Sequence, residues 1–209
     1  MLNTFSLSSF HPLCDKLASA DPDLAAILQA HGYPPMWNRP NTFETLVHII
    51  LEQQVSLASA LSALNKLRDK VHIITPEKVL SLTDEELKAC YFSRQKAGYV
   101  RYLAASVLNG GLDLPLLPAL SDDEVRTQLV TLKGIGNWTI DVYLIFVLQR
   151  ADIFPLGDLA AVNALKRIKH LPGETHRDAL LPFIDRWKPY RTIATMLLWH
   201  YYLSSPVKK

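Results

Sequence analysis

Cysteine is scarce in this 209-residue chain, which contains only Cys14 and Cys90. Two isolated cysteines cannot build a disulfide framework, and they cannot supply the four ligands of a zinc or iron–sulfur centre. The seven histidines are scattered, with no His-x-x-x-His pair that would suggest a metal site. The cysteine content therefore indicates a reducing compartment, and neither a catalytic metal nor a cofactor is expected.

Long apolar runs are also absent. No stretch approaches the roughly 18–20 residues of a membrane span, and the N-terminus lacks the basic and then apolar segments of a secretory signal. The net charge is only +2 and the pI is near 8.5, so composition neither supports nor excludes nucleic-acid binding. Any basic face has to be local. We expect a soluble cytoplasmic protein, or a nuclear one if the source is eukaryotic, with no membrane partner.

Strand-like alternation is nearly absent, while helical periodicity dominates, which predicts an all-α fold of about ten or more helices. Polar residues that can cap a helix precede most of the apolar stripes. These capping positions are Asn41 or Thr42, Ser56, Thr75, Thr83, Ser93 and Ser121. Further helices are predicted at 11–20, 22–31, 158–168, 174–187 and 190–203, with proline-containing connections at 33–40 and 114–118.

A Gly-x-Gly turn at 132–139 separates two predicted helices. A capping box of Ser121 and Glu124 begins the first helix, and the second is apolar on most sides and therefore expected to be buried. Gly134 and Gly136 leave backbone amides at a helix N-terminus, which is a site for an anion. Such a turn can hold a nucleic-acid backbone without reading its sequence, or it can be an ordinary turn.

An acid follows the turn at the start of the next predicted helix, in the segment Phe-Pro-Leu-Gly-Asp that ends at Asp158. Aspartate is a favoured N-cap there, and capping orients the carboxylate, so the same group can also act on a substrate. Asp141 and Asp152 are competing acids. The residues alone leave a structural and a catalytic interpretation of Asp158 open.

Several segments together carry a resemblance to a known family. They are the hairpin Leu-Lys-Gly-Ile-Gly-Asn-Trp-Thr at 132–139, Gly157-Asp158, Ile-Leu-Glu-Gln-Gln-Val-Ser at 50–56, Phe-Ser-Arg-Gln-Lys-Ala at 92–97, and Trp-Lys-Pro-Tyr-Arg-Thr at 187–192 with Trp199. In order and spacing across 40–202, the chain resembles the helix-hairpin-helix, Gly/Pro-rich, aspartate superfamily of DNA glycosylases. Within it, the chain is most similar to the DNA-3-methyladenine glycosylase II branch.

The resemblance implies an all-α fold of two lobes with DNA crossing the cleft between them. One lobe would be a central helical barrel, 36–150, ending in the hairpin 132–138, and the other would combine 1–35 with 151–209. The implied function is that of a monomeric enzyme that flips alkylated purines out of double-stranded DNA and excises them by hydrolysis, in the nucleoid or the nucleus. The alternatives are a glycosylase for a deaminated, etheno or oxidised base, and a non-catalytic binder of damaged DNA.

The resemblance assigns the chemistry to Asp158. Breaking an N-glycosidic bond builds positive charge on the deoxyribose, which a nearby carboxylate stabilises. An alkylated purine is already a cationic leaving group, so one acid suffices. Members with lyase activity carry a lysine two residues after the second hairpin glycine, where this chain has Trp138. A monofunctional glycosylase without lyase activity is therefore expected.

The resemblance also implies how DNA is held. Gln54, with Gln53 beside it, matches the wedge that fills the gap left by the extruded base, although both glutamines can simply cap helix ends. Arg191 is assigned to DNA or to the region around the aspartate, with an ion pair as the alternative. Arg94, Lys96 and Arg101 lie on one predicted helix. We interpret them by default as a solvent-exposed face of that helix, with contact to the DNA backbone as the alternative. The remaining expected DNA contacts are Ser56, Lys133, Gly134, Gly136 and Thr139.

Electron-poor methylated bases stack well between aromatic rings, and Trp199 matches the family's pocket tryptophan. Further expected pocket walls are Trp138, Tyr143, Trp37 and Tyr33, each of which can instead be a core residue. In this family the hairpin carbonyls often hold a monovalent cation. The resemblance therefore implies a non-catalytic Na⁺ or K⁺ ion at the backbone of Leu132 and Ile135.

Overall fold

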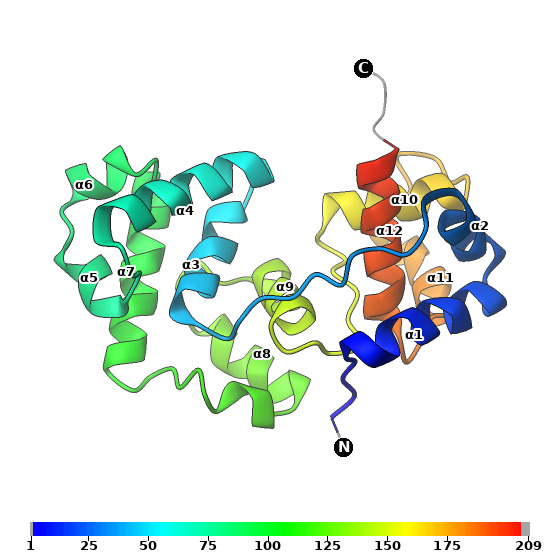
Figure 1. Cartoon of the computed structure of the whole chain (residues 1–209), viewed down its shortest axis with the longest axis horizontal. Coiled ribbons are helices and arrows are strands. Elements are labelled where there is room, and N and C mark those ends of the chain that lie inside the picture. Colours follow the sequence, from blue (N-terminus) through cyan, green and yellow to red (C-terminus); the bar gives the residue numbers. More distant parts are fainter. Residues whose placement is uncertain (1, 206–209) are drawn as a thin grey trace. The chain divides into compact units, whose positions relative to one another are not determined.

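The computed structural model describes residues 2–205, and every regular element among them is a helix, apart from one isolated β-bridge between Thr4 and Arg150 (Figure 1). This confirms the all-α prediction. The elements are α1 (Leu7–Ala20), α2 (Pro22–His31), α3 (Phe43–Glu52), α4 (Leu57–Val71), α5 (Pro76–Ser81), α6 (Asp84–Ala89), α7 (Arg94–Leu108), η1 (Leu117–Ala119), α8 (Asp122–Val130), α9 (Asn137–Phe146), α10 (Leu159–Ile168), η2 (Arg177–Leu180), α11 (Leu181–Asp185) and α12 (Arg191–Ser204).

Local side-chain hydrogen bonds explain where most helices begin. The hydroxyl of each predicted capping residue accepts the backbone N–H three positions further on, which satisfies a donor that has no partner inside the helix. This arrangement is found at Thr42, Ser56, Thr75, Thr83, Ser93 and Ser121. At Ser121 the capping box with Glu124 is complete. These predicted helix starts are confirmed.

Two predicted helix bounds are wrong. The first helix begins at Leu7 rather than residue 11, because Ser6 and Ser9 form a capping box ahead of it. The predicted helix 174–187 is instead broken into η2 and α11, which begins at Leu181. Pro182 lies in the first turn of α11 and has no N–H to donate, so it cannot continue a helix from upstream.

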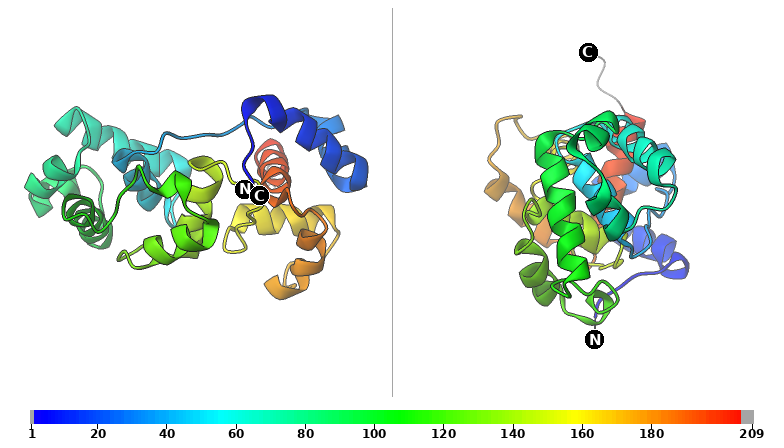
Figure 2. Two further views of the ribbon diagram at one scale, coloured as in Figure 1. Left: turned by 90° about the horizontal axis from the view of Figure 1, so that it is seen from below. Right: turned by 90° about the vertical axis from the view of Figure 1, so that its left-hand side faces the viewer.

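The described chain forms two compact units. The first holds the chain up to Asn38 and from Leu144 onward. In this unit α12 packs against α1, α2 and α10, as Figure 2 shows for the red helix and its blue and yellow neighbours. Residues 192–199 of α12 are buried throughout. The core of this unit is thus assembled from both ends of the sequence.

The second unit is Arg39–Tyr143. Its central helix is α3, which packs against α4 and α7 and buries eight of its ten residues. The sequence placed the unit boundaries at residues 35 and 150. The structure assigns 144–150 to the first unit instead, where the Phe5 amide donates to the Gln149 carbonyl and Thr4 pairs with Arg150.

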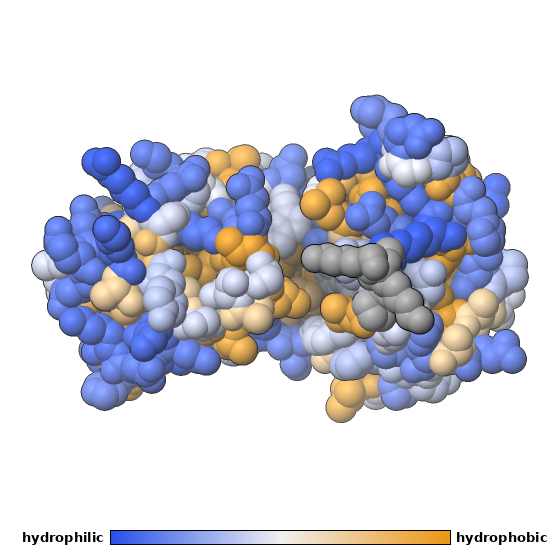
Figure 3. Space-filling view, turned by 90° about the horizontal axis from the view of Figure 1, so that it is seen from above, coloured by the Kyte–Doolittle hydropathy of each residue, from blue (hydrophilic) through white to orange (hydrophobic). Residues whose placement is uncertain are grey.

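Among the described residues, no helix combines the length and the apolar character that crossing a membrane would require. On the face shown in Figure 3, apolar surface appears as separate patches bordered by hydrophilic residues. Most of the apolar side chains instead fill the two cores.

Candidate functional site

Asp158 lies at the N-terminus of α10 in the first unit, half-buried, where its side chain does two things. Its Oδ1 atom accepts the backbone N–H of Ala161 at 2.8 Å, which is the N-cap bond. The same oxygen accepts the indole N–H of Trp199 at 2.9 Å. The capping interpretation is therefore correct, and the second donor fixes the carboxylate in one orientation.

Aromatic rings from two other segments contact the ring of Trp199. The ring of Phe146 lies 5.3 Å from it, and the ring of Trp37 lies 6.4 Å from it in an edge-on arrangement. The Trp37 backbone carbonyl accepts a hydrogen bond from Gln149, which ties the loop after α2 to the end of α9. The structure thus brings together Asp158, Trp199 and Trp37 as the sequence predicts. It adds Phe146, which the sequence placed only in an apolar helix.

The two competing acids are paired with arginines. Asp141 is buried and accepts a hydrogen bond from Arg126 in the second unit. Burial raises the pKa of Asp141, and Arg126 opposes that rise. In the first unit, Arg191 donates from Nε to Asp152 at 2.7 Å and from Nη2 to both Asp152 Oδ2 and its carbonyl at 3.0 Å. Arg191 therefore forms the ion pair that was the alternative to DNA contact.

The two hairpin glycines have different surroundings. Gly134 has a φ of +87°, and a Cβ added there would lie 2.2 Å from Cγ of Tyr99. A Cβ added at Gly136 would meet no atom within 4 Å. Gly134 is thus required by the fold, because its backbone is left-handed and packs on an aromatic ring. Gly136 is instead exposed, with open space where a side chain would lie.

Gln53 and Thr139 face the hairpin rather than solvent. The Gln53 side chain donates from Nε2 to the Gly134 carbonyl at 2.8 Å and to the Thr139 hydroxyl at 2.9 Å. Thr139 is buried. These two side chains, which the sequence assigned to DNA, are engaged inside the second unit. The DNA contacts expected of them stay predictions, and the structure shows that the Nε2 atom of Gln53 is already engaged by the hairpin.

Gln54, Ser56 and Lys133 lie at the surface of the second unit. Gln54 has a φ of +57°, so it forms the tip of a tight turn between α3 and α4. The Ser56 hydroxyl accepts the Ser59 amide as the N-cap of α4. Behind this turn, Glu52 is buried and accepts two hydrogen bonds from Arg39, at 2.7 and 2.8 Å. Gln54 is thus an exposed side chain on an anchored turn, as a wedge requires.

Two of the aromatic pocket candidates have other surroundings. Tyr143 is fully buried in the second unit, where its hydroxyl donates to Asn41 at 2.7 Å. It is a core residue and cannot line an open pocket. Tyr33 is exposed, stacks on His11 with ring centres 4.1 Å apart, and donates to Asp15 at 2.7 Å. Trp138 is half-buried in the first turn of α9.

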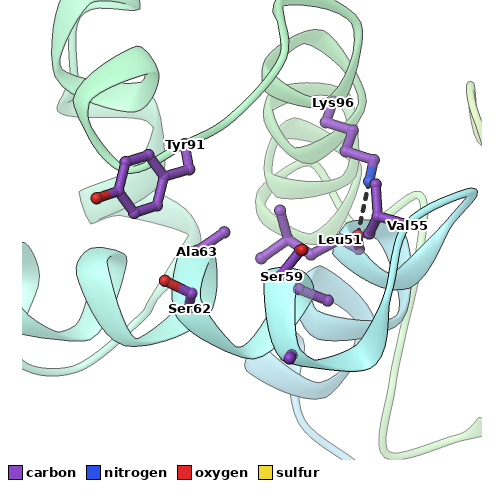
Figure 4. Close-up of a pocket in the computed structure, with 9 residues that line it drawn as sticks. Leu51, Val55, Ser59, Ser62, Ala63, Tyr91 and Lys96 are labelled. Carbon is purple, nitrogen blue, oxygen red and sulfur yellow. Dashed lines mark hydrogen bonds between the residues drawn. The ribbon is translucent and has the colours of Figure 1, made fainter.

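The basic side chains of α7 are mostly engaged. Lys96 donates to the Leu51 carbonyl at 2.6 Å, and both residues line a cavity of about 480 Å³ (Figure 4). Burial lowers the pKa of the Lys96 amine. Arg101 donates to the Leu82 carbonyl at 2.7 Å and pairs with Asp84 at 2.9 Å. Arg94 is exposed. The solvated-face interpretation thus fails for Lys96, which holds the last turn of α3.

Within the part of the chain that the structure describes, no group of three or more His, Cys, Asp or Glu side chains could hold a metal ion. The expected monovalent cation would instead use backbone carbonyls. The Leu132 carbonyl accepts the Ile135 amide at 3.0 Å, and a carbonyl oxygen has a second lone pair. Leu132 therefore still offers an acceptor that such an ion needs.

Comparison with known proteins defines the class. Residues 47–189 match the model of the HhH-GPD superfamily of base excision DNA repair proteins. The chain belongs to this family. It is 30% identical over 184 residues to Bacillus subtilis YfjP, a match that covers 84% of this chain and 64% of that protein. It is 29% identical over 166 residues to DNA-3-methyladenine glycosylase 1 of Schizosaccharomyces pombe, covering 75% of this chain and 71% of that one.

Solved structures agree with this assignment. A Schizosaccharomyces pombe 3-methyladenine DNA glycosylase, solved in complex with abasic DNA, superposes with a TM-score of 0.86 at 25% identity and covers 95% of this chain and all of that one. An 8-oxoguanine glycosylase/lyase of Clostridium acetobutylicum has a TM-score of 0.80 at 18% identity over 93% of this chain and 70% of that one. The second similarity shows the fold alone, so the fold does not by itself select a lesion.

Proposed function

We propose that this protein is a monofunctional DNA glycosylase that hydrolyses the N-glycosidic bond of alkylated purines, of the 3-methyladenine and 7-methylguanine type, in base excision repair. The observation that carries the proposal is the Asp158 carboxylate, held by Ala161 and Trp199 beside an aromatic cluster, in a chain of the HhH-GPD family. The names of the relatives support the alkylated base as substrate.

The carboxylate supplies the electrostatic part of the reaction. As the base departs, the deoxyribose gains positive charge, and the ionised Asp158 side chain stabilises it. The two donors on Oδ1, the Ala161 amide and the Trp199 indole, fix its position. The carboxylate also orients the attacking water. No general acid is required, because an alkylated purine carries its positive charge while it is bonded to the deoxyribose and departs as a neutral base that takes the bonding electron pair.

The aromatic cluster suits the proposed base. The rings of Trp199, Phe146 and Trp37 come from α12, α9 and the loop after α2. A cationic purine is attracted to the faces of such rings, most strongly to tryptophan. A neutral undamaged base lacks that attraction, which favours the alkylated one.

The second unit carries the proposed DNA grip. The open amides at Gly136 and the exposed Lys133 amine would hold the phosphate backbone. Gln54 would fill the space left in the duplex by the extruded base. A Na⁺ or K⁺ ion at the carbonyls of Leu132 and Ile135 would add positive charge to the phosphate contact without taking part in the chemistry.

Trp138 occupies the place of the lysine that forms a Schiff base in lyases, so the product is an abasic site in an intact strand. The test is to incubate the wild-type protein with alkylated genomic DNA and to identify the released bases by chromatography. We expect 3-methyladenine and 7-methylguanine in the soluble fraction. Release of only hypoxanthine, ethenoadenine or an oxidised purine, from DNA that contains those lesions, would show that the substrate class is a different one. Binding to damaged DNA without release of any base would show that the protein is a non-catalytic binder.

A further inference from the structure

Gln53 links the two segments of the second unit to which DNA contact is assigned. It is the C-cap residue of α3, directly before the exposed Gln54. Its side chain reaches the hairpin, 81 positions away in the sequence, through the hydrogen bond to Gly134. A second hydrogen bond goes to Thr139 in the first turn of α9. One amide group thus joins the wedge turn, the hairpin and the helix after it.

The orientation of this amide follows from its partners. The Gly134 carbonyl can only accept a hydrogen bond, so the NH₂ group of Gln53, and not its oxygen, has to face it. The Thr139 hydroxyl accepts the second hydrogen of the same group. Both N–H donors of the group are therefore used, and the two acceptors together fix its position relative to the hairpin.

Helix α7 contacts both of the segments that Gln53 joins, the end of α3 and the hairpin. Lys96 donates to the Leu51 carbonyl in the last turn of α3, as Figure 4 shows, and Tyr99 packs against the Cα atom of Gly134. The turn that carries Gln54 and the hairpin are thus each held by α7 and are joined directly by Gln53. These contacts form a closed ring that joins the turn, the hairpin and α7.

We propose that Gln53 is a positioning residue that couples the grip of the hairpin on the DNA backbone to the insertion of Gln54 into the duplex. The inference rests on the proposed function. To extrude a base, the protein has to hold the DNA backbone at one point and insert a side chain into the duplex at another. If the two contacts are coupled, the binding energy of the hairpin contributes to the insertion of Gln54. The effect of Gln53 should therefore scale with the work of extruding the base.

The test uses Gln53→Met, which keeps the length and removes both donors without adding charge. Two duplexes carry 7-methylguanine, one opposite cytosine and one opposite an abasic site. Opposite the abasic site the lesion is unpaired, so its extrusion costs less free energy. Single-turnover excision by Gln53→Met should fall about tenfold on the paired duplex, and less than about twofold on the unpaired one. The double variant with Gln54→Ala should be no slower than the slower single variant, because both changes remove the same contribution.

Gln29→Met, at an exposed position of α2 in the other unit, is the matched control and should excise normally. If Gln53→Met fails to fold, as judged by its melting curve, Thr139→Val replaces it, since it removes one acceptor and should show a smaller loss with the same preference for the paired duplex. Equal losses on both duplexes, losses that multiply with Gln54→Ala, or no loss would overturn the coupling. Absence of base release by the wild-type protein would instead overturn the proposed function.

Discussion

The indole N–H of Trp199 and the carboxylate of Asp158 are joined by a hydrogen bond of 2.9 Å, although 41 positions separate them in the sequence. Trp199 is almost completely buried and also contacts Phe146 and Trp37. One side chain therefore both holds the proposed catalytic oxygen and forms a wall of the aromatic cluster. Orientation of the acid and recognition of the base are linked through this tryptophan.

Trp199→Phe should separate these two roles. Phenylalanine keeps an aromatic ring in the cluster but has no donor for Asp158. We expect the single-turnover rate of base release to fall about tenfold or more, as for the loss of a hydrogen bond to a charged group, with a smaller change in KM. Trp37→Phe is the control, because it alters a ring that packs on Trp199 and leaves the indole donor of Trp199 to Asp158 in place. Equal effects of the two changes on the rate would show that the indole donor is unimportant.

The two hairpin glycines should respond differently to substitution. Gly134→Ala places a Cβ against Tyr99 on a left-handed backbone, and should lower the free energy of unfolding by roughly 1–3 kcal/mol. Gly136→Leu should leave the melting temperature unchanged and weaken binding to abasic-site DNA about tenfold or more, because its side chain stands between the amides and the phosphate. Thermal melting and fluorescence anisotropy measure the two effects. Unchanged DNA affinity in Gly136→Leu would make the hairpin a structural turn.

Lys133 is exposed and should act through its charge alone. In Lys133→Ala, binding should weaken equally on damaged and undamaged duplexes, and the slope of log Kd against log salt should fall by about 1. The single-turnover rate at saturating protein should stay unchanged.

Borohydride trapping should give no covalent adduct with the wild-type protein. An adduct that disappears in Lys133→Ala would make this lysine a nucleophile.

Asp21 should make the first unit sensitive to acid. Burial raises the pKa of its carboxyl, but hydrogen bonds from Lys169, Trp187 and the Asp23 amide outweigh this, so the pKa lies below its ordinary 3.8. The resulting stabilisation is complete above the unfolded value and is lost as the pH falls below 3.8 through the folded value. Urea unfolding measures the free energy of unfolding at about pH 6 and at about pH 3. The decrease between the two pH values should be smaller in Asp21→Asn than in the wild type. An identical loss in both proteins would place the acid sensitivity elsewhere.

Local patterns predicted the helix starts well, because a cap joins residues three positions apart. Ser121 with Glu124, and Asp158 with Ala161, are examples in which the predicted N-cap is the observed one. The broken segment around Pro182 was also readable in principle, since proline cannot lie inside a helix.

Partners far apart in the sequence could not be predicted in this way. Nothing local to Gln53 indicates that its amide faces the hairpin, and its assignment to DNA contact came from the family resemblance. Tyr143 was misplaced because α9 is apolar on nearly every side, so its pattern does not distinguish a pocket wall from the core. The family resemblance supplied the assignment of Asp158, while Phe146 was found only from the packing around Trp199.

The most direct test of the central claim is Asp158→Asn. Asparagine is also a good N-cap, so α10 and the melting temperature should be preserved. We expect release of 3-methyladenine from alkylated DNA to fall at least about 100-fold, while binding to abasic-site DNA stays within about threefold of the wild type, since the hairpin grip is untouched. Release at the wild-type rate by a folded Asp158→Asn protein would contradict the catalytic role of this carboxylate.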